Sequence, residues 1–304
     1  MPGVKLKNYL HLHFLVFIAG FTAILGELIS IGSISLVWYR MGIATILMYL
    51  YIKIAGIDLI TNRNAIMGFF GAGIIIALHW ITFFEAIRQS NISITLAMFS
   101  TGAFFASFIE PLIYRKPVVG YEIFFGILVV IGVFMITQSE IHQIYGIVLG
   151  VVSAMLSSLF AVINGKFIER YNATVISFYE FISGVLFITL FIIAFGSGFS
   201  ASFFTLSAND WIWLFILASI CTAYAFIGSV KVMKHISPYT VVLSYNLEPV
   251  YGICLALWLF PETETMSAQF YYGALLILLT LFMDAVIKNS KHFKKKSTIR
   301  HGSD

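Results

Sequence analysis

Charged residues are scarce in this sequence. Asp, Glu, Lys and Arg make up 11% of its 304 residues, whereas hydrophobic residues make up 60%. Soluble globular chains typically carry about 25% charged residues. A water-facing surface cannot be built from so few charges, and the mean hydropathy of +0.95 agrees. The composition therefore predicts a membrane protein whose main solvent is lipid.

Cysteine is nearly absent, and the common enzyme motifs are missing. Cys221 and Cys254 lie inside apolar runs without CxxC spacing, which argues against a disulfide or a metal site. The sequence contains no HExxH, GxSxG, P-loop or Gly-rich dinucleotide motif. We therefore expect no enzymatic activity, no metal, no cofactor and no ATP-driven pumping by this chain alone.

Long apolar runs occupy most of the chain. A bilayer core of about 30 Å requires roughly 20 apolar residues per helix. The runs do not alternate with period two, as strands of a membrane barrel would, so we expect helices. The prediction is an all-α membrane protein with ten transmembrane helices. The ten segments are Tyr9–Ile31, Ser33–Ile54, Ala65–Ile87, Ile92–Tyr114, Val118–Ile136, Ile144–Ile163, Ala173–Phe195, Trp211–Val232, Pro238–Phe260 and Phe270–Ile287.

Basic residues indicate the orientation. With the N-terminus in the cytoplasm, 16 of the 18 Lys and Arg residues lie at cytoplasmic ends. Only Arg88 then lies outside, and Arg40 lies within a span. Because cytoplasmic loops are enriched in Lys and Arg, we expect a multi-pass protein of the cell membrane with both termini in the cytoplasm. The basic tail, residues 289–304, is expected to contact anionic lipid rather than nucleic acid.

The two halves of the chain show weak self-similarity. At an offset of 146 residues, the stretch 86–89 aligns with 232–235, and at an offset of 140 Arg40 aligns with Glu180. Each half holds five predicted helices, so the second copy starts on the opposite side of the membrane. We therefore predict two inverted five-helix repeats, an arrangement typical of secondary transporters. The predicted repeats cover residues 1–138 and 143–288.

The stretch SPYTVVLSYNLEPVYGICLALWLFPETET resembles the end of an EamA domain of the drug/metabolite transporter superfamily. The matching residues are Pro249 within the ninth helix and Glu262 at its end. The stretch LFAVINGKFIER is also similar to the family. The first half departs from the pattern, because Ala103 stands in place of the proline and Lys116 in place of an acidic residue. The first repeat is therefore expected to bend differently.

This resemblance implies a transporter of small molecules. Family members mostly export amino acids, related metabolites or toxic compounds, and the resemblance implies a central cavity lined by both repeats. An organic-anion or nucleotide-sugar carrier is the first alternative, although it would require more cations in the spans than Arg40 alone. An intramembrane enzyme or an assembly factor without transport activity is the alternative of another class. The oligomeric state stays open.

Glu248 is the strongest candidate among the ionisable residues, which are costly inside a membrane unless they are paired or functional. Thr240, Ser244 and Glu248 follow the spacing i, i+4, i+8 and would share one helix face. Pro249 frees a carbonyl nearby, which is tolerated only next to a partner or water. We expect this face to bind substrate and Glu248 to exchange a coupling proton. A packing role for a neutral Glu248 is the alternative.

Arg40 and Glu180 are the next candidates. The planar guanidinium of Arg40 matches a carboxylate, so it is predicted either to bind a substrate carboxylate or to form a structural ion pair with Glu27. Glu180 is the second candidate for the coupling proton, with a structural partner such as Lys166 or Lys231 as the alternative.

His79 and Trp80 lie in the middle of the third span and are candidates to line the substrate cavity. A packing histidine and a lipid-facing tryptophan are the alternatives. Ser157 of the sixth span is a further candidate substrate contact, and hydrogen bonds between helices explain it equally well.

Overall fold

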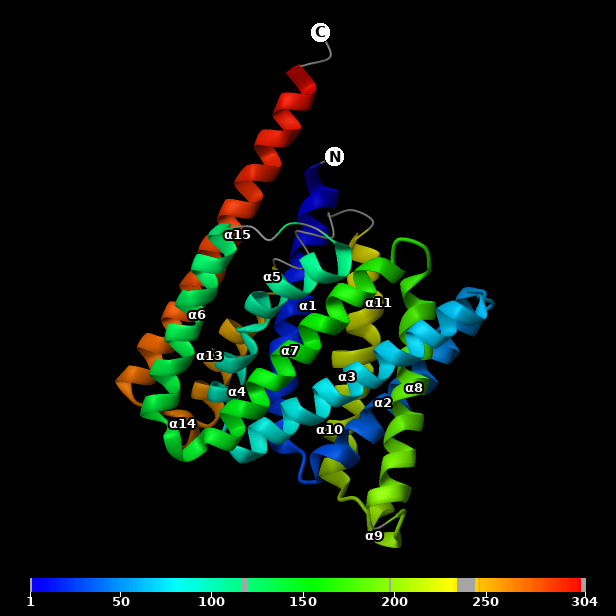
Figure 1. Cartoon of the computed structure of the whole chain (residues 1–304). Coiled ribbons are helices and arrows are strands. Elements are labelled where there is room, and N and C mark those ends of the chain that lie inside the picture. Colours follow the sequence, from blue (N-terminus) through cyan, green and yellow to red (C-terminus); the bar gives the residue numbers. More distant parts are fainter. Residues whose placement is uncertain are drawn as a thin grey trace.

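The computed structural model describes residues 2–115, 117, 120–196, 198–233, 244–245 and 247–301. Every regular element in these ranges is helical (Figure 1). The elements are α1 (Pro2–Leu28), α2 (Ser33–Ala55), α3 (Arg63–Gln89), α4 (Ile92–Phe99), α5 (Gly102–Tyr114), α6 (Gly120–Ser139), η1 (Ile141–Gln143), α7 (Ile144–Phe167), α8 (Ala173–Phe195), α9 (Ala201–Phe204), α10 (Ala208–Ala218), η2 (Ser219–Tyr224), α11 (Ala225–Met233), α13 (Glu248–Leu259), α14 (Pro261–Glu264) and α15 (Ala268–His301).

Eight helices in the described part are long and apolar enough to cross a membrane. They agree with the first eight predicted segments, within a few residues at each end. The ninth and tenth segments are represented by the shorter apolar helices Glu248–Leu259 and Ala268–Asp284. The predicted start of the ninth span at Pro238 and the candidate Thr240 lie outside the described residues. The backbone of the basic tail continues α15 as helix to His301.

Short polar side chains start the helices. The side chain of Asn62 accepts a hydrogen bond from the Ala65 amide at the start of α3, and Asn91 and Asn172 cap α4 and α8 in the same way. At α10 the hydroxyl of Ser207 accepts from the Asp210 amide. Each cap satisfies an amide that the first helical turn leaves without a partner, which stabilises a helix by about 1 kcal/mol.

The helices form one bundle in which both chain termini lie at the same end (Figure 1). We call this the proximal end, and we call the opposite end, which carries α9 and α14, the distal end. In the first half α3 packs against α7 and α8; in the second half α10 and α11 pack against α1 and α2. Likewise α4 and α5 pack on α7, and α13 packs on α1. Contacts between the halves therefore occur in matching pairs.

The pair α6 and α15 crosses at two glycines. A Cβ atom on Gly132 would lie 2.9 Å from the Gly273 carbonyl oxygen, and one on Gly273 would lie 2.8 Å from that of Gly132. A larger side chain at either position would push the two backbones apart.

The predicted span Ile92–Tyr114 is divided in the structure. A turn at Ser100 and Thr101 separates α4 from α5, and no proline causes it. Instead, the Ser100 hydroxyl donates to the Leu96 carbonyl and the Thr101 hydroxyl to the Met98 carbonyl. Such bonds to the preceding turn bend helices.

The ninth segment also has a helix start within it. Leu247 lies in a turn and α13 begins at Glu248, so Ser244 and Glu248 do not share one uninterrupted helix face as the spacing predicted. The first residue of α5, Gly102, and that of α13, Glu248, are 146 residues apart, which is the offset found between the halves. The two helix starts therefore occupy matching places.

Candidate functional site

Arg40 of α2 is buried in the bundle, with 3% of its surface exposed. Its Nε donates a hydrogen bond of 2.8 Å to the hydroxyl of Thr222. Thr222 lies in η2, a π-helical turn, where its hydroxyl also donates to the Leu217 carbonyl five residues earlier. Because π turns interrupt the regular ladder and occur often at functional sites, η2 explains why this hydroxyl is placed to receive Arg40.

The guanidinium of Arg40 lies on aromatic rings. Its Cζ is 4.0 Å from the centre of the Trp80 ring and 5.6 Å from that of Phe84. A cation over a desolvated indole gains about 2 kcal/mol. Trp80 is itself buried and contacts the rings of Phe181 and Phe226. The structure thus brings together Arg40 and Trp80, two of the predicted site residues.

One side of the guanidinium has no partner. The Nη1 atom of Arg40 is buried and makes no hydrogen bond, and no carboxylate of the described residues lies within 4.0 Å of it. A guanidinium stays charged, and a buried charge without a counterion is costly. This arrangement fits an anionic group that the described residues do not supply.

Glu248 is a carboxyl group in the same interior region as Arg40. It begins α13, with Pro249 in the first turn, where a missing amide hydrogen is tolerated. Its carboxylate and the Arg40 guanidinium attract each other across a gap longer than an ion pair. Gly20 allows the backbones of α1 and α13 to pack closely here, because a Cβ there would lie 3.0 Å from the backbone carbonyl oxygen of Glu248.

Glu27 does not pair with Arg40. It lies instead at the distal end, where it lines a hollow with a volume of about 380 Å³ between α1, α3 and α14. The charged groups beside it are Arg88 and Glu264. The apolar sequence of α2 carries little information on the direction in which Arg40 faces, which explains why the predicted pair is not formed.

Glu180 occupies a separate place, on α8 near the proximal end. Its side chain is fully buried, and its Oε1 accepts a hydrogen bond of 2.8 Å from Asn164 of α7. Its Oε2 makes no hydrogen bond. The alternative partner Lys166 donates to the Ile113 carbonyl instead.

His79 is held by α7 rather than directed at Arg40. Its Nδ1 lies 3.0 Å from the Ser153 carbonyl oxygen, and the Ser153 hydroxyl contacts both Nδ1 and the His79 carbonyl. Only a protonated Nδ1 can bond a carbonyl, so this contact selects that tautomer. The ring also stacks on Phe99 at 5.5 Å. Ser157 is half-buried and is not brought to Arg40 by any of these contacts.

Carboxylates join the two halves at the distal end. Glu264 accepts hydrogen bonds from the amides of Ile92 and Ser93 at the start of α4, at 3.0 and 2.8 Å. Asp210 at the start of α10 accepts from the amide and the hydroxyl of Ser30. We call these contacts the distal carboxylate contacts. The sequence interpretation missed them, because acidic residues at helix ends are ordinary in loops that face water.

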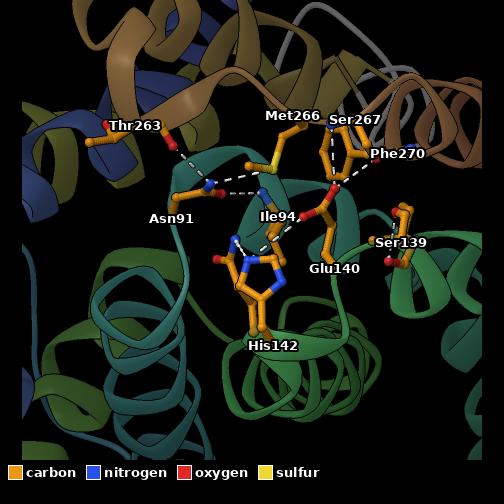
Figure 2. A network of polar contacts seen from close by, with 11 residues as sticks. Asn91, Ile94, Ser139, Glu140, His142, Thr263, Met266, Ser267 and Phe270 are labelled. Atoms are coloured by element: carbon orange, nitrogen blue, oxygen red, sulfur yellow. Dashed lines mark hydrogen bonds and ion pairs between the residues drawn. The ribbon is translucent and has the colours of Figure 1, made fainter.

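A third distal contact involves the linker between the halves. Figure 2 shows Glu140 reaching Ser267, whose hydroxyl donates to it at 2.8 Å. Nearby, the side-chain amide of Asn91 donates to the Thr263 carbonyl at 3.1 Å (Figure 2). Segments more than 100 residues apart in the sequence therefore meet at this end of the bundle.

Comparisons with known proteins agree with this architecture. The model of the EamA-like transporter family matches residues 7–138 and 144–284, so one domain type occurs twice and covers most of the chain. A solved structure described only as "Crystal structure of protein" aligns with a TM-score of 0.63 at 12% identity, over 91% of this chain and 96% of that chain. At this identity the likeness concerns the fold alone. No curated protein matches the chain.

Proposed function

We propose that this chain, which belongs to the EamA-like transporter family, exports amino acids or related zwitterionic metabolites across the cell membrane. The observation that carries the proposal is the buried Nη1 of Arg40, which has no hydrogen-bond partner among the described residues. A substrate carboxylate in that place would complete the hydrogen bonds of the guanidinium fork.

Glu248 supports a zwitterion over a simple anion. Its carboxylate lies in the same interior region as Arg40 but is too far away to form an ion pair with it. A substrate lying between them would offer its carboxylate to Arg40 and its ammonium to Glu248. Trp80 would cover one side of such a substrate, because its ring already lies against the guanidinium.

Secondary or facilitated transport by two inverted repeats is the mechanism we propose. Three findings support it: the family model matches twice, the contacts between the halves occur in pairs, and α5 and α13 begin at matching places. Two equivalent packings of such repeats would open the Arg40 region first to one side and then to the other. The distribution of Lys and Arg supports ten spans with the proximal end in the cytoplasm.

The test of the substrate class is flux of labelled amino acids in proteoliposomes, after a growth screen of an overexpressing strain against toxic analogues. Arg40→Lys keeps the charge but loses the planar fork, so we expect flux to fall by about tenfold to a hundredfold, the equivalent of one charged hydrogen bond. Arg88→Lys is the matched control, because Arg88 is exposed at the distal end.

Normal amino acid flux in Arg40→Lys would remove Arg40 from substrate binding. Flux of organic anions without an amino group, unaffected by Glu248→Gln, would favour the organic-anion carrier instead. The non-transporting alternative would be favoured by two results together: cells lacking the protein export normally, and no compound tested shows flux in proteoliposomes.

The orientation has its own test. Single cysteines at Thr205 and Arg63, which are exposed at the distal and proximal ends, are placed in a cysteine-free protein. We expect a membrane-impermeant maleimide to label Thr205→Cys in intact cells and Arg63→Cys only after lysis. Labelling of Arg63→Cys in intact cells would contradict the proposed orientation.

A further inference from the structure

We propose that Glu180 binds the coupling proton of this transporter, an inference that rests on the proposed function. The carboxyl group is fully buried, and only one of its oxygens has a partner. That partner is the neutral side-chain amide of Asn164, which donates to Oε1. The geometry suits a neutral carboxylic acid, with Oε1 as the carbonyl oxygen and the proton on Oε2.

The charged side chains of the described part that lie on helices next to Glu180 are bonded elsewhere or distant. Lys166 donates to the Ile113 carbonyl, Arg40 binds Thr222, and His79 is held by Ser153. No cation of the described residues lies within 4.0 Å of the carboxyl. The helices packed against α8 are α2, α3 and α11, and α7 reaches Glu180 through Asn164. Their titratable and charged groups are Tyr39, Arg40, Tyr49, Tyr51 and Lys53 on α2, Arg63, His79, Glu85 and Arg88 on α3, Tyr145 and Lys166 on α7, and Lys231 on α11, whose side chain lies outside the described part.

An ionised carboxylate in this place would be costly. Burial of a charge without a counterion costs several kcal/mol, and one hydrogen bond from a neutral amide does not offset that cost. In the closed arrangement the group therefore holds a proton. When the neighbouring helices separate and water reaches it, the carboxylate is hydrated and the proton leaves to that side. One proton bound and one released per cycle balances the exchange.

Glu248 is less suited to this task. Its carboxylate lies in the same interior region as the Arg40 guanidinium and is the group that we propose binds the substrate ammonium, so it is already engaged in substrate binding. The sequence pattern favoured Glu248 as the coupling residue; we favour Glu180 because its buried carboxyl has a single neutral hydrogen-bond partner. The two roles also separate in space. Arg40 is seven residues from the distal start of α2 at Ser33, whereas Glu180 is seven residues from the proximal start of α8 at Ala173.

This arrangement places the substrate anion site and the proton site at corresponding residues of the two repeats. Tyr39-Arg40 aligns with Tyr179-Glu180. One repeat would bind the substrate carboxylate and the other the proton, so the same rocking motion would expose both. A proton moving down a potential of 100 mV supplies about 2.3 kcal/mol, which is enough to drive accumulation of about fiftyfold.

The experiment measures substrate flux in proteoliposomes with and without a pH gradient, and counterflow exchange without one. We expect wild type to show gradient-stimulated flux. Glu180→Gln, which keeps the acceptor for Asn164, should retain counterflow and lose the stimulation. Glu248→Gln is the comparison variant: its substrate affinity should fall, while the ratio of flux with and without the gradient is kept.

Several results would overturn the proposal. These are stimulation that persists in Glu180→Gln, wild-type flux that ignores the gradient, and flux that depends on Na⁺ at constant pH. If wild-type flux ignores the gradient or depends on Na⁺ while counterflow is still measured, the proposed transport function is kept and only the coupling role of Glu180 is rejected. If wild type shows no counterflow at all, the proposed function itself is rejected. If Glu180→Gln does not fold, Glu180→Asp serves in its place. This variant keeps a titrating group, so flux should still be stimulated by the pH gradient, but with a shifted midpoint of its pH dependence. An unshifted midpoint would reject Glu180 as the coupling residue.

Discussion

The distal and proximal ends of the bundle are joined by different chemistry. At the distal end the halves meet through Glu264 and Asp210, whose oxygens accept from backbone amides of the first half. At the proximal end the described contacts between the halves use no carboxylate. The exposed Lys166 donates to the Ile113 carbonyl, Asn62 donates to the Tyr171 hydroxyl, and the Tyr179 hydroxyl donates to the Leu59 carbonyl.

This difference has an energetic meaning. A hydrogen bond to a charged group contributes about 1.5–3 kcal/mol, whereas a neutral one contributes about 0.5–1.5 kcal/mol. Glu264 and Asp210 are buried, so water competes weakly for them. The distal closure should therefore be the stronger one, and the resting protein should favour a state that is closed at the distal end.

Removal of the Glu264 carboxylate should have the largest effect. Glu264→Ala leaves the amides of Ile92 and Ser93 without an acceptor, so we expect a loss of about 2–4 kcal/mol of stability and a lower thermal unfolding midpoint in detergent. Glu262→Ala is the matched control, because Glu262 lies two residues away and is exposed.

The same variant tests the distal closure directly. A cysteine at Ser93, a buried position at the start of α4, should react with an external maleimide at least tenfold faster when Glu264 is Ala. An unchanged labelling rate together with an unchanged unfolding midpoint would show that the distal carboxylate contacts do not hold this end closed.

The proximal end should respond less. Tyr179→Phe removes the hydroxyl that donates to the Leu59 carbonyl and leaves the ring against Phe69. We expect the free energy of unfolding to fall by about 1 kcal/mol or less. A cysteine at Arg63 should be labelled a few-fold faster at most. A loss equal to that in Glu264→Ala would remove the difference between the two ends.

The sequence predicted the parts of this structure that depend on length and hydrophobicity. Eight spans follow from apolar runs, and Arg40 was identified because it is the only basic residue within a span. Its partners were not predicted. Thr222 reaches Arg40 from a π turn, which shifts the helical register in a way that spacing does not reveal.

The distal carboxylate contacts were also beyond the sequence. Glu264 and Ile92 are separated by 172 residues, and nothing local marks them as partners. The turn at Ser100 and Thr101 was missed for another reason. Helix interruptions were expected at prolines, and this one has no proline; the hydroxyl groups of Ser100 and Thr101 bond carbonyls of the preceding turn there.

The contact between Glu264 and α4 also bears on how the protein is made. The first half leaves the ribosome with the amides of Ile92 and Ser93 uncapped, and their acceptor is synthesised about 170 residues later. At typical rates of 5–20 residues per second, this delay is roughly 10–30 s. During that interval the start of α4 has to stay near water, because membrane lipid offers no acceptor for its amides. The start of α4 would therefore stay solvated at the distal surface, and this end of the bundle would close only when the last quarter of the chain arrives.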